Sequence, residues 1–206
     1  SATSDVYKRQ GGDCRRMMPD FAWRALRDAA ERGHTGSLQN LERLILYKLR
    51  TTDPEEMHDI AEIGQGQGLE YRLYKAKRCA SLEELLRAIQ TKRYPMARLR
   101  RILLHILLDI RHQDMQGVPP YGRILAFNET GKEVLRLSKR TRKLPFSHSL
   151  AELAQTSPEA GRCAALESQA TDIYQLSRAV IGKGESDFRR RTAMTQKQPT
   201  VDHTQE

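Results

Sequence analysis

The chain has 206 residues, with 35 Lys and Arg against 26 Asp and Glu, a formal net charge of +9 and a pI near 9.7. This length suits one main domain with tails, and the positive charge favours an anionic partner such as RNA, DNA or an acidic membrane surface. A basic protein without such a partner is the alternative. Three widely spaced cysteines without a C-x-x-C pair exclude a disulfide framework and indicate a reducing, cytoplasmic location.

The two ends of the chain carry no helical period of apolar residues. Residues 1–10, SATSDVYKRQ, are predicted to be a non-native leader, and the missing initial methionine predicts a fragment of a longer protein. Residues 183–206 are polar and are predicted to be a disordered tail. The longest apolar run, Ile102 to Leu108, is too short to cross a bilayer, so we expect no membrane-spanning segment.

The first half of the chain contains several helix signals. From residue 19 to residue 50 apolar side chains recur at spacings of three and four, and Ser37 is a predicted N-cap. Pro54 fits the first turn of a further helix. Ser81 and Glu84 form a capping box in front of the apolar run of the next helix.

The second half continues this helical pattern. Pro95 is predicted to start a helix with an apolar stripe formed by Leu99, Ile102, Leu103, Ile106 and Ile110. Thr130 and Glu133 form another capping box. A last helix is predicted over LESQATDIYQLSRAVIG, with Leu166, Ala170, Ile173 and Leu176 facing inward.

Two segments lie between these helices. The segment QGVPPYGRILAF can be helical or extended, and LPFSHS is predicted to be extended. The expected fold class is mainly α, a multi-helix C-terminal domain with short extended segments.

Sites for metal or nucleophilic chemistry are weakly supported. His105, Asp109 and His112 could approach one metal ion, but their spacing is not H-E-x-x-H, which favours structural histidines. His34, in RGHTG, lacks the second histidine of an H-x-G-H motif. The glycine-rich segment 64–68 follows no predicted strand, and no P-loop or G-x-S-x-G motif is present.

The cations give a stronger signal. One group surrounds Tyr94 at the start of the predicted helix after Pro95, and a second contains Arg136, Lys139, Arg140, Arg142 and Lys143. Arginine binds phosphate oxygens bidentately, and an aromatic ring can stack on an unpaired base, a combination that suits single-stranded RNA. The alternative is a solvated helix face whose cations form salt bridges with nearby glutamates.

Four stretches carry a resemblance to a known family: LILYKLRTTDPEEMHDIAEI, GLEYRLYKAKRCASLEELLRAIQTKRYPMARLRRILLHILLDI, YGRILAFNETGKEVL and ATDIYQLS. Over roughly Pro19 to Leu176 the chain resembles the C-terminal part of bacterial tRNA(Met) cytidine acetate ligases, which are nucleotidyltransferases. The resemblance implies an enzyme that uses ATP and acetate to form acetyl-adenylate and then N4-acetylcytidine at the wobble position of elongator tRNA(Met). The family's N-terminal catalytic domain, with its H-x-G-H-like motif, is not found in this sequence.

The resemblance therefore implies a division of the chain into a helical link at 11–52, a tRNA-binding domain at 53–182 and no catalytic residue, so that the piece alone is inactive. Two departures from the family pattern stand out: Tyr71 replaces an expected Asn, and Pro95-Met96 replaces a Thr followed by a basic residue. The predicted RNA-binding residues are Arg72, Lys92, Arg93, Tyr94, Arg98, Arg100, Arg101 and Arg140.

Two alternatives remain for the function. The chain could be a stand-alone helical RNA-binding or scaffold protein without catalysis. It could also be a peripheral membrane protein, although the helix after Pro95 lacks the wide polar face that such a role needs.

Overall fold

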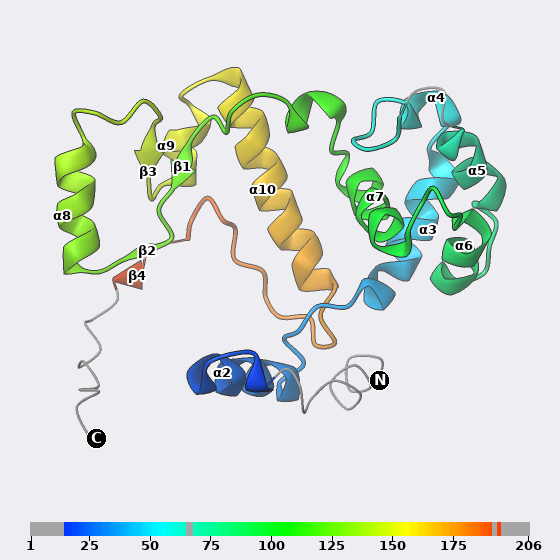
Figure 1. Ribbon diagram of the computed structural model, residues 1–206, viewed down its shortest axis with the longest axis horizontal. Coiled ribbons are helices and arrows are strands. Elements are labelled where there is room, and N and C mark those ends of the chain that lie inside the picture. Colours follow the sequence, from blue (N-terminus) through cyan, green and yellow to red (C-terminus); the bar gives the residue numbers. More distant parts are fainter. Residues whose placement is uncertain (1–14, 65–67, 191–192, 195–206) are drawn as a thin grey trace. The chain divides into compact units, whose positions relative to one another are not determined.

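The computed structural model describes residues 15–64, 68–190 and 193–194 (Figure 1). The predicted leader at 1–10 and most of the predicted tail therefore lie outside the described residues. The α-helices are α2 (Asp20–Glu31), α3 (Glu42–Thr51), α4 (Pro54–Met57), α5 (Leu69–Ala76), α6 (Leu82–Ile89), α7 (Met96–Leu108), α8 (Glu129–Ser138), α9 (Leu150–Ala154) and α10 (Pro158–Leu176). Two 3-10 helices, η1 (Leu38–Leu41) and η2 (His112–Met115), accompany them.

The chain divides into two compact units. Unit 1 comprises Ser1–Gly117 and Gln169–Gly184, and unit 2 comprises Val118–Ser168 and Glu185–Glu206, so that α10 contributes to both. These units group residues by contact. The functional division predicted from the sequence, with boundaries after residues 10, 52 and 182, stays a prediction.

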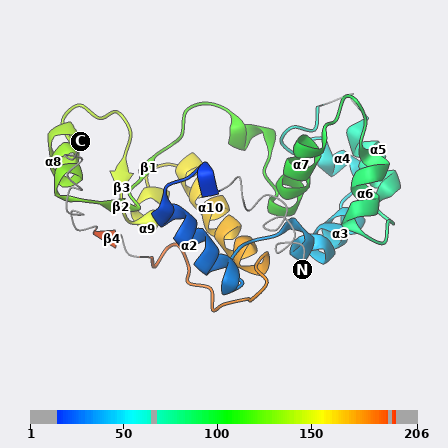
Figure 2. The same ribbon diagram turned by 60° about the horizontal axis from the view of Figure 1, so that its bottom comes forward.

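The core of unit 1 is formed by α3, α5, α6 and α7, which Figures 1 and 2 show gathered together. The predicted stripe of α7 is confirmed for four of its members, since Leu99, Ile102, Leu103 and Ile106 are at most 1% exposed. Each fully buried Leu or Ile contributes about 1.5–3 kcal/mol. The fifth member, Ile110, lies beyond the end of the helix and is half-buried.

Local hydrogen bonds explain where the helices of unit 1 begin. The Ser81 hydroxyl accepts a bond from the Glu84 N–H at 3.1 Å, and the Glu84 carboxylate accepts one from the Ala80 N–H at 2.8 Å, which confirms the predicted start of α6. Ser37 caps η1 by accepting from the Gln39 N–H. Pro95 is the N-cap of α7 rather than its first residue, because its ψ of 152° is extended.

The helices of unit 2 begin earlier than the sequence predicts. The side chain of Asn128 accepts a hydrogen bond from the Gly131 N–H at 2.8 Å and starts α8 at Glu129, so the capping box predicted at Thr130 is wrong. α10 begins at Pro158, before the predicted segment. Its Leu176, predicted to face inward, is 39% exposed.

Short parallel strand pairs complete unit 2. β1 (Gly122–Arg123) pairs with β3 (Phe146–Ser147), and β2 (Ala126–Phe127) pairs with β4 (Ala193–Met194). The segment whose state the sequence leaves open is thus extended, as is the one around Phe146. These extended segments are short, as predicted, and they pair in parallel across long stretches of sequence.

A small second core lies in unit 2 and holds Tyr121, Leu150, Leu153, Ala160 and Ala164. Among the helices in the described ranges, none combines the length and the apolar character needed to cross a membrane.

Candidate nucleic-acid interface

The turn before α7 presents two of the predicted cations. Lys92 and Arg93 are exposed between Thr91 and Tyr94, which are joined by a bridge and by a Tyr94 N–H to Thr91 carbonyl bond of 3.1 Å. Tyr94 itself is only 4% exposed and belongs to the core of unit 1. The guanidinium groups of Arg93 and Arg98 lie 5.9 and 5.4 Å from its ring centre. Tyr94 therefore orients these arginines and presents no free ring face for a base.

Glu62 binds two of the predicted arginines. Its carboxylate accepts bonds from Arg101 Nε at 2.5 Å and Nη2 at 2.6 Å, and it lies 3.9 Å from Arg98 Nε. Arg98 Nη2 also donates to the Glu62 carbonyl at 2.9 Å. The hydrogen bond from Arg101 lowers the pKa of Glu62, and the same bond raises the pKa of Arg101. Part of the positive charge of this surface is thus neutralised internally, as the salt-bridge alternative predicts.

The other predicted cations are distributed over both units. Arg100 is exposed on α7, and Arg72 is exposed on α5, both in unit 1. Arg140 is exposed beyond the end of α8 in unit 2. The structure thus brings Lys92, Arg93, Arg98, Arg100 and Arg101 into one stretch around the start of α7, and it places Arg140 in the other unit.

The exposed face of α5 is a second candidate surface. Of its residues, only Arg72 is among the predicted RNA-binding residues. Its buried side holds Leu69, Glu70 and Leu73, so the residues between them point outward. They line a cavity of about 540 Å³, which we call the α5 groove, formed by Gly68, Tyr71, Arg72, Lys75, Ala76, Cys79 and Ala88. The spacing of residues 71, 72 and 75 opposite an apolar stripe is the sequence signal that could have identified this face.

The ring of Tyr71 packs against the ring of His58. His58 meets it edge-on, with ring centres 6.1 Å apart and an interplanar angle of 88°. His58 Nε2 lies 3.9 Å from a carboxylate oxygen of Glu70, whose side chain is only 2% exposed. Tyr71 remains 50% exposed, so one side of its ring is anchored while the rest is accessible.

The two histidines whose spacing was weighed as a metal site have other partners. His105 Nδ1 lies 3.2 Å from the Ala61 carbonyl, and His112 Nε2 lies 3.0 Å from the Ile63 carbonyl. Asp109 accepts hydrogen bonds from Arg111. In the ranges that the structure describes, no group of three or more His, Cys, Asp or Glu side chains is arranged to hold a metal ion.

Unit 2 contains a buried ionic cluster that the sequence did not reveal. Arg123, 8% exposed in its side chain, pairs with Glu167 and with Asp187, at 3.4 Å from the latter. Tyr121 donates to Glu167 at 2.9 Å, and burial followed by a bond to Cys163 raises the pKa of Tyr121. Burial alone would lower the pKa of Arg123, but hydrogen bonds to Glu167 raise it. The cluster holds three separate chain segments of unit 2 together.

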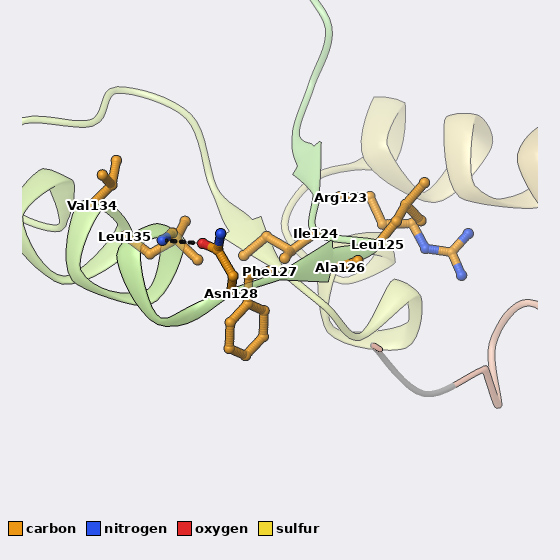
Figure 3. A pocket seen from close by; sticks show the side chains of 9 residues that line it. Arg123, Ile124, Leu125, Ala126, Phe127, Asn128, Val134 and Leu135 are labelled. Carbon is orange, nitrogen blue, oxygen red and sulfur yellow. Dashed lines mark hydrogen bonds between the residues drawn. The ribbon is translucent and has the colours of Figure 1, made fainter. Parts of the chain in front are cut away.

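Beside this cluster lies a cavity of about 790 Å³, which we call the α8 groove (Figure 3). It is lined by Arg123, Ile124, Leu125, Ala126, Phe127, Asn128, Gly131, Val134 and Leu135. Figure 3 shows the Arg123 guanidinium pointing away from α8. The lining side chains are therefore mainly apolar, and the Asn128 amide is the polar side chain that remains beside α8.

Comparison with known proteins places the chain in a family. The sequence profile of the HIGH Nucleotidyl Transferase family matches residues 2–187. The chain belongs to this family. It is 34% identical over 170 residues to a tRNA(Met) cytidine acetate ligase of Thermoanaerobacter sp. strain X514, covering 79% of the chain and 40% of that protein. It is 32% identical over 151 residues to the tRNA(Met) cytidine acetate ligase of Alkaliphilus metalliredigens, covering 69% of the chain and 35% of that protein.

The fold agrees with that of a solved structure. The crystal structure of Thermotoga maritima TmcAL bound with alpha-thio ATP superposes with a TM-score of 0.81 at 22% identity, covering 95% of this chain and 51% of that one. The chain thus spans about two fifths of the first ligase and about half of this structure.

Membership in the HIGH nucleotidyl transferase family corrects two predictions. The interpretation of the chain as a C-terminal part without the catalytic domain is wrong, because the profile of the catalytic family extends over residues 2–187. In the expected fold class, the assignment to a C-terminal domain is wrong for the same reason, whereas the mainly α character agrees with the helices of the structure. The lack of a second histidine beside His34 does not exclude this family, because the family profile matches residues 2–187.

Proposed function

We propose that this chain belongs to an ATP-dependent tRNA(Met) cytidine acetate ligase, which forms N4-acetylcytidine at the wobble position, and that its basic surfaces bind the tRNA. The observation that carries the proposal is the 34% identity to the Thermoanaerobacter ligase over 79% of the chain. The names of further relatives, such as the Caldanaerobacter subterraneus ligase at 33% identity, support the same activity.

The charge distribution supports tRNA as the substrate. Lys92, Arg93 and Arg100 are exposed, and among the described residues no carboxylate lies within salt-bridge distance of them. Free cations on a rigid helix entrance bind phosphates and release counterions, which makes binding salt-dependent. Elongator tRNA(Met) as the particular tRNA, and the cytoplasm as the location, are part of the proposal.

ATP is proposed as a co-substrate because a structural neighbour was solved with an ATP analogue. The α8 groove does not fit a triphosphate, because Arg123, its one cation, is already paired with two carboxylates. We therefore assign no described residue to ATP or to acetate, and no step of the reaction is attributed to a side chain of this chain.

Nucleoside mass spectrometry tests the proposal. The intact gene product is incubated with a tRNA(Met) transcript, ATP and acetate, and the RNA is digested to nucleosides. N4-acetylcytidine is expected with this transcript, and none is expected when the wobble cytidine is replaced by uridine or when ATP is omitted. If the Thermoanaerobacter ligase acetylates the transcript in parallel and this protein does not, the proposed activity is wrong.

A further inference from the structure

We propose that the α5 groove is a subsite for one unpaired nucleotide of RNA, whose base stacks on Tyr71 while Arg72 and Lys75 bind an adjacent phosphate. This inference rests on the RNA-binding part of the proposed function and adds a specific contact to it. No role in the family pattern suggests it, because Tyr71 stands where the resemblance leads us to expect Asn.

Tyr71 offers an aromatic ring on which a base can stack. In unit 1, Tyr94 is buried, whereas Tyr71 is 50% exposed at the rim of a cavity. The edge contact from His58 fixes the orientation of the Tyr71 ring before any ligand arrives. A ring that is already held loses little conformational entropy when a base stacks on it. Stacking on aromatic side chains accepts any base, which suits an unpaired nucleotide.

The second step is the charge of the groove. Arg72 and Lys75 are exposed, and no carboxylate of the described residues lies within 4.0 Å of either cation. A third cation strengthens this end of α5: Arg50 donates from Nε to the Lys77 carbonyl at 3.1 Å and from Nη2 to the Cys79 carbonyl at 3.2 Å. The groove is thus complementary to an anionic ligand.

The third step is the shape of the groove. Cys79 and Ala88 have small side chains and leave a cavity of about 540 Å³ beside Tyr71. Such a volume falls in the usual range for small-molecule and nucleotide sites. Burial and then the neighbouring Glu84 carboxylate raise the pKa of Cys79, so its thiol is neutral, and the negative charge of Glu84 lies on the Cys79 side of the groove. The groove therefore offers an apolar floor, one aromatic wall and a cationic rim.

The test uses a single-stranded RNA hexamer with a central 2-aminopurine, whose fluorescence falls when the base stacks on an aromatic ring. Tyr71→Ala is expected to abolish the quenching and weaken binding by about 5- to 100-fold, while Tyr71→Phe retains both. Tyr47→Ala is the matched control, because Tyr47 is 67% exposed on α3 and does not line the groove. Thermal melting of each variant confirms that it is folded.

Three results would overturn the inference: equal quenching in wild type and Tyr71→Ala, equal weakening by Tyr71→Ala and Tyr47→Ala, or full displacement of the RNA by a poly-glutamate of matched charge. The last result would assign the groove to acidic peptides. The two proposals fail separately. Acetylation of tRNA(Met) with no effect of Tyr71→Ala on the hexamer removes the subsite alone, whereas hexamer stacking without acetylation removes the ligase activity alone.

Discussion

Replacing Glu62 by Gln is predicted to lower stability and to raise RNA affinity at the same time. The carboxylate of Glu62 accepts two bonds from Arg101 and lies 3.9 Å from Arg98, so that one negative charge offsets part of two positive charges. The amide is nearly isosteric and keeps the backbone, whose φ of 67° is equally strained with either side chain.

The magnitude follows from the exposure of the pair. The side chains of Glu62 and Arg101 are 25% and 54% exposed, which places their interaction among partly exposed ion pairs worth about 1 kcal/mol or less. Losing the carboxylate releases Arg101 for a phosphate and removes one negative charge beside Arg98, which keeps its hydrogen bond to the carbonyl of residue 62. Each new phosphate contact steepens the slope of log affinity against log salt by about 0.7–0.9.

The stability effect also has a defined pH dependence. The pKa of Glu62 is lowered from 4.5 in the folded protein, so its contribution is present above that unfolded value and is lost as the pH falls through the lowered folded value. Urea denaturation of wild type and Glu62→Gln should therefore differ at pH 7 and converge in strong acid. Filter binding over a salt series measures the affinity. Unchanged RNA affinity and salt slope, or equal stability at pH 7, would refute the reasoning.

The remaining predictions concern single side chains. Arg93→Ala is expected to weaken tRNA binding and flatten the salt slope by about one unit per lost phosphate contact, and filter binding with an unchanged slope would contradict it. Arg101→Ala should have a smaller effect, because its charge is already paired. Leu103→Ala, at a fully buried site, should cost about 2–5 kcal/mol in urea denaturation, and a loss under 1 kcal/mol would show that the site is not packed as described. Arg123→Ala removes the ion pairs with Glu167 and with Asp187, whose side chain is 4% exposed, and should cost about 1.5–3 kcal/mol, seen as lost hydrogen-exchange protection in unit 2.

Local features of the fold were predictable from the sequence because they depend on neighbouring residues. The cap at Ser81 and the apolar stripe from Leu99 to Ile106 follow from short-range hydrogen bonding and helical periodicity. The start of α8 was misplaced because Asn128, just outside the predicted capping box, provides the actual cap. Parallel pairing of β1 with β3 could not be predicted, since two-residue strands carry no periodic signal.

The candidate site was predictable in its composition but less in its geometry. The cluster of cations around residues 92–101 is visible in the sequence, but the Glu62 carboxylate that binds Arg101 lies 39 positions away. The burial of Tyr94 and the exposure of Tyr71 depend on which helix faces meet in unit 1. Long-range contacts of this kind need the fold.

If the exposed cations before α7, Lys92 and Arg93, hold tRNA for acetylation, the acetylation rate should depend on them at low tRNA(Met) concentration. The intact protein and its Lys92→Gln/Arg93→Gln double variant are compared by nucleoside mass spectrometry. We expect a several-fold higher KM for tRNA in the variant, with a similar rate at saturating tRNA. An unchanged KM would contradict it.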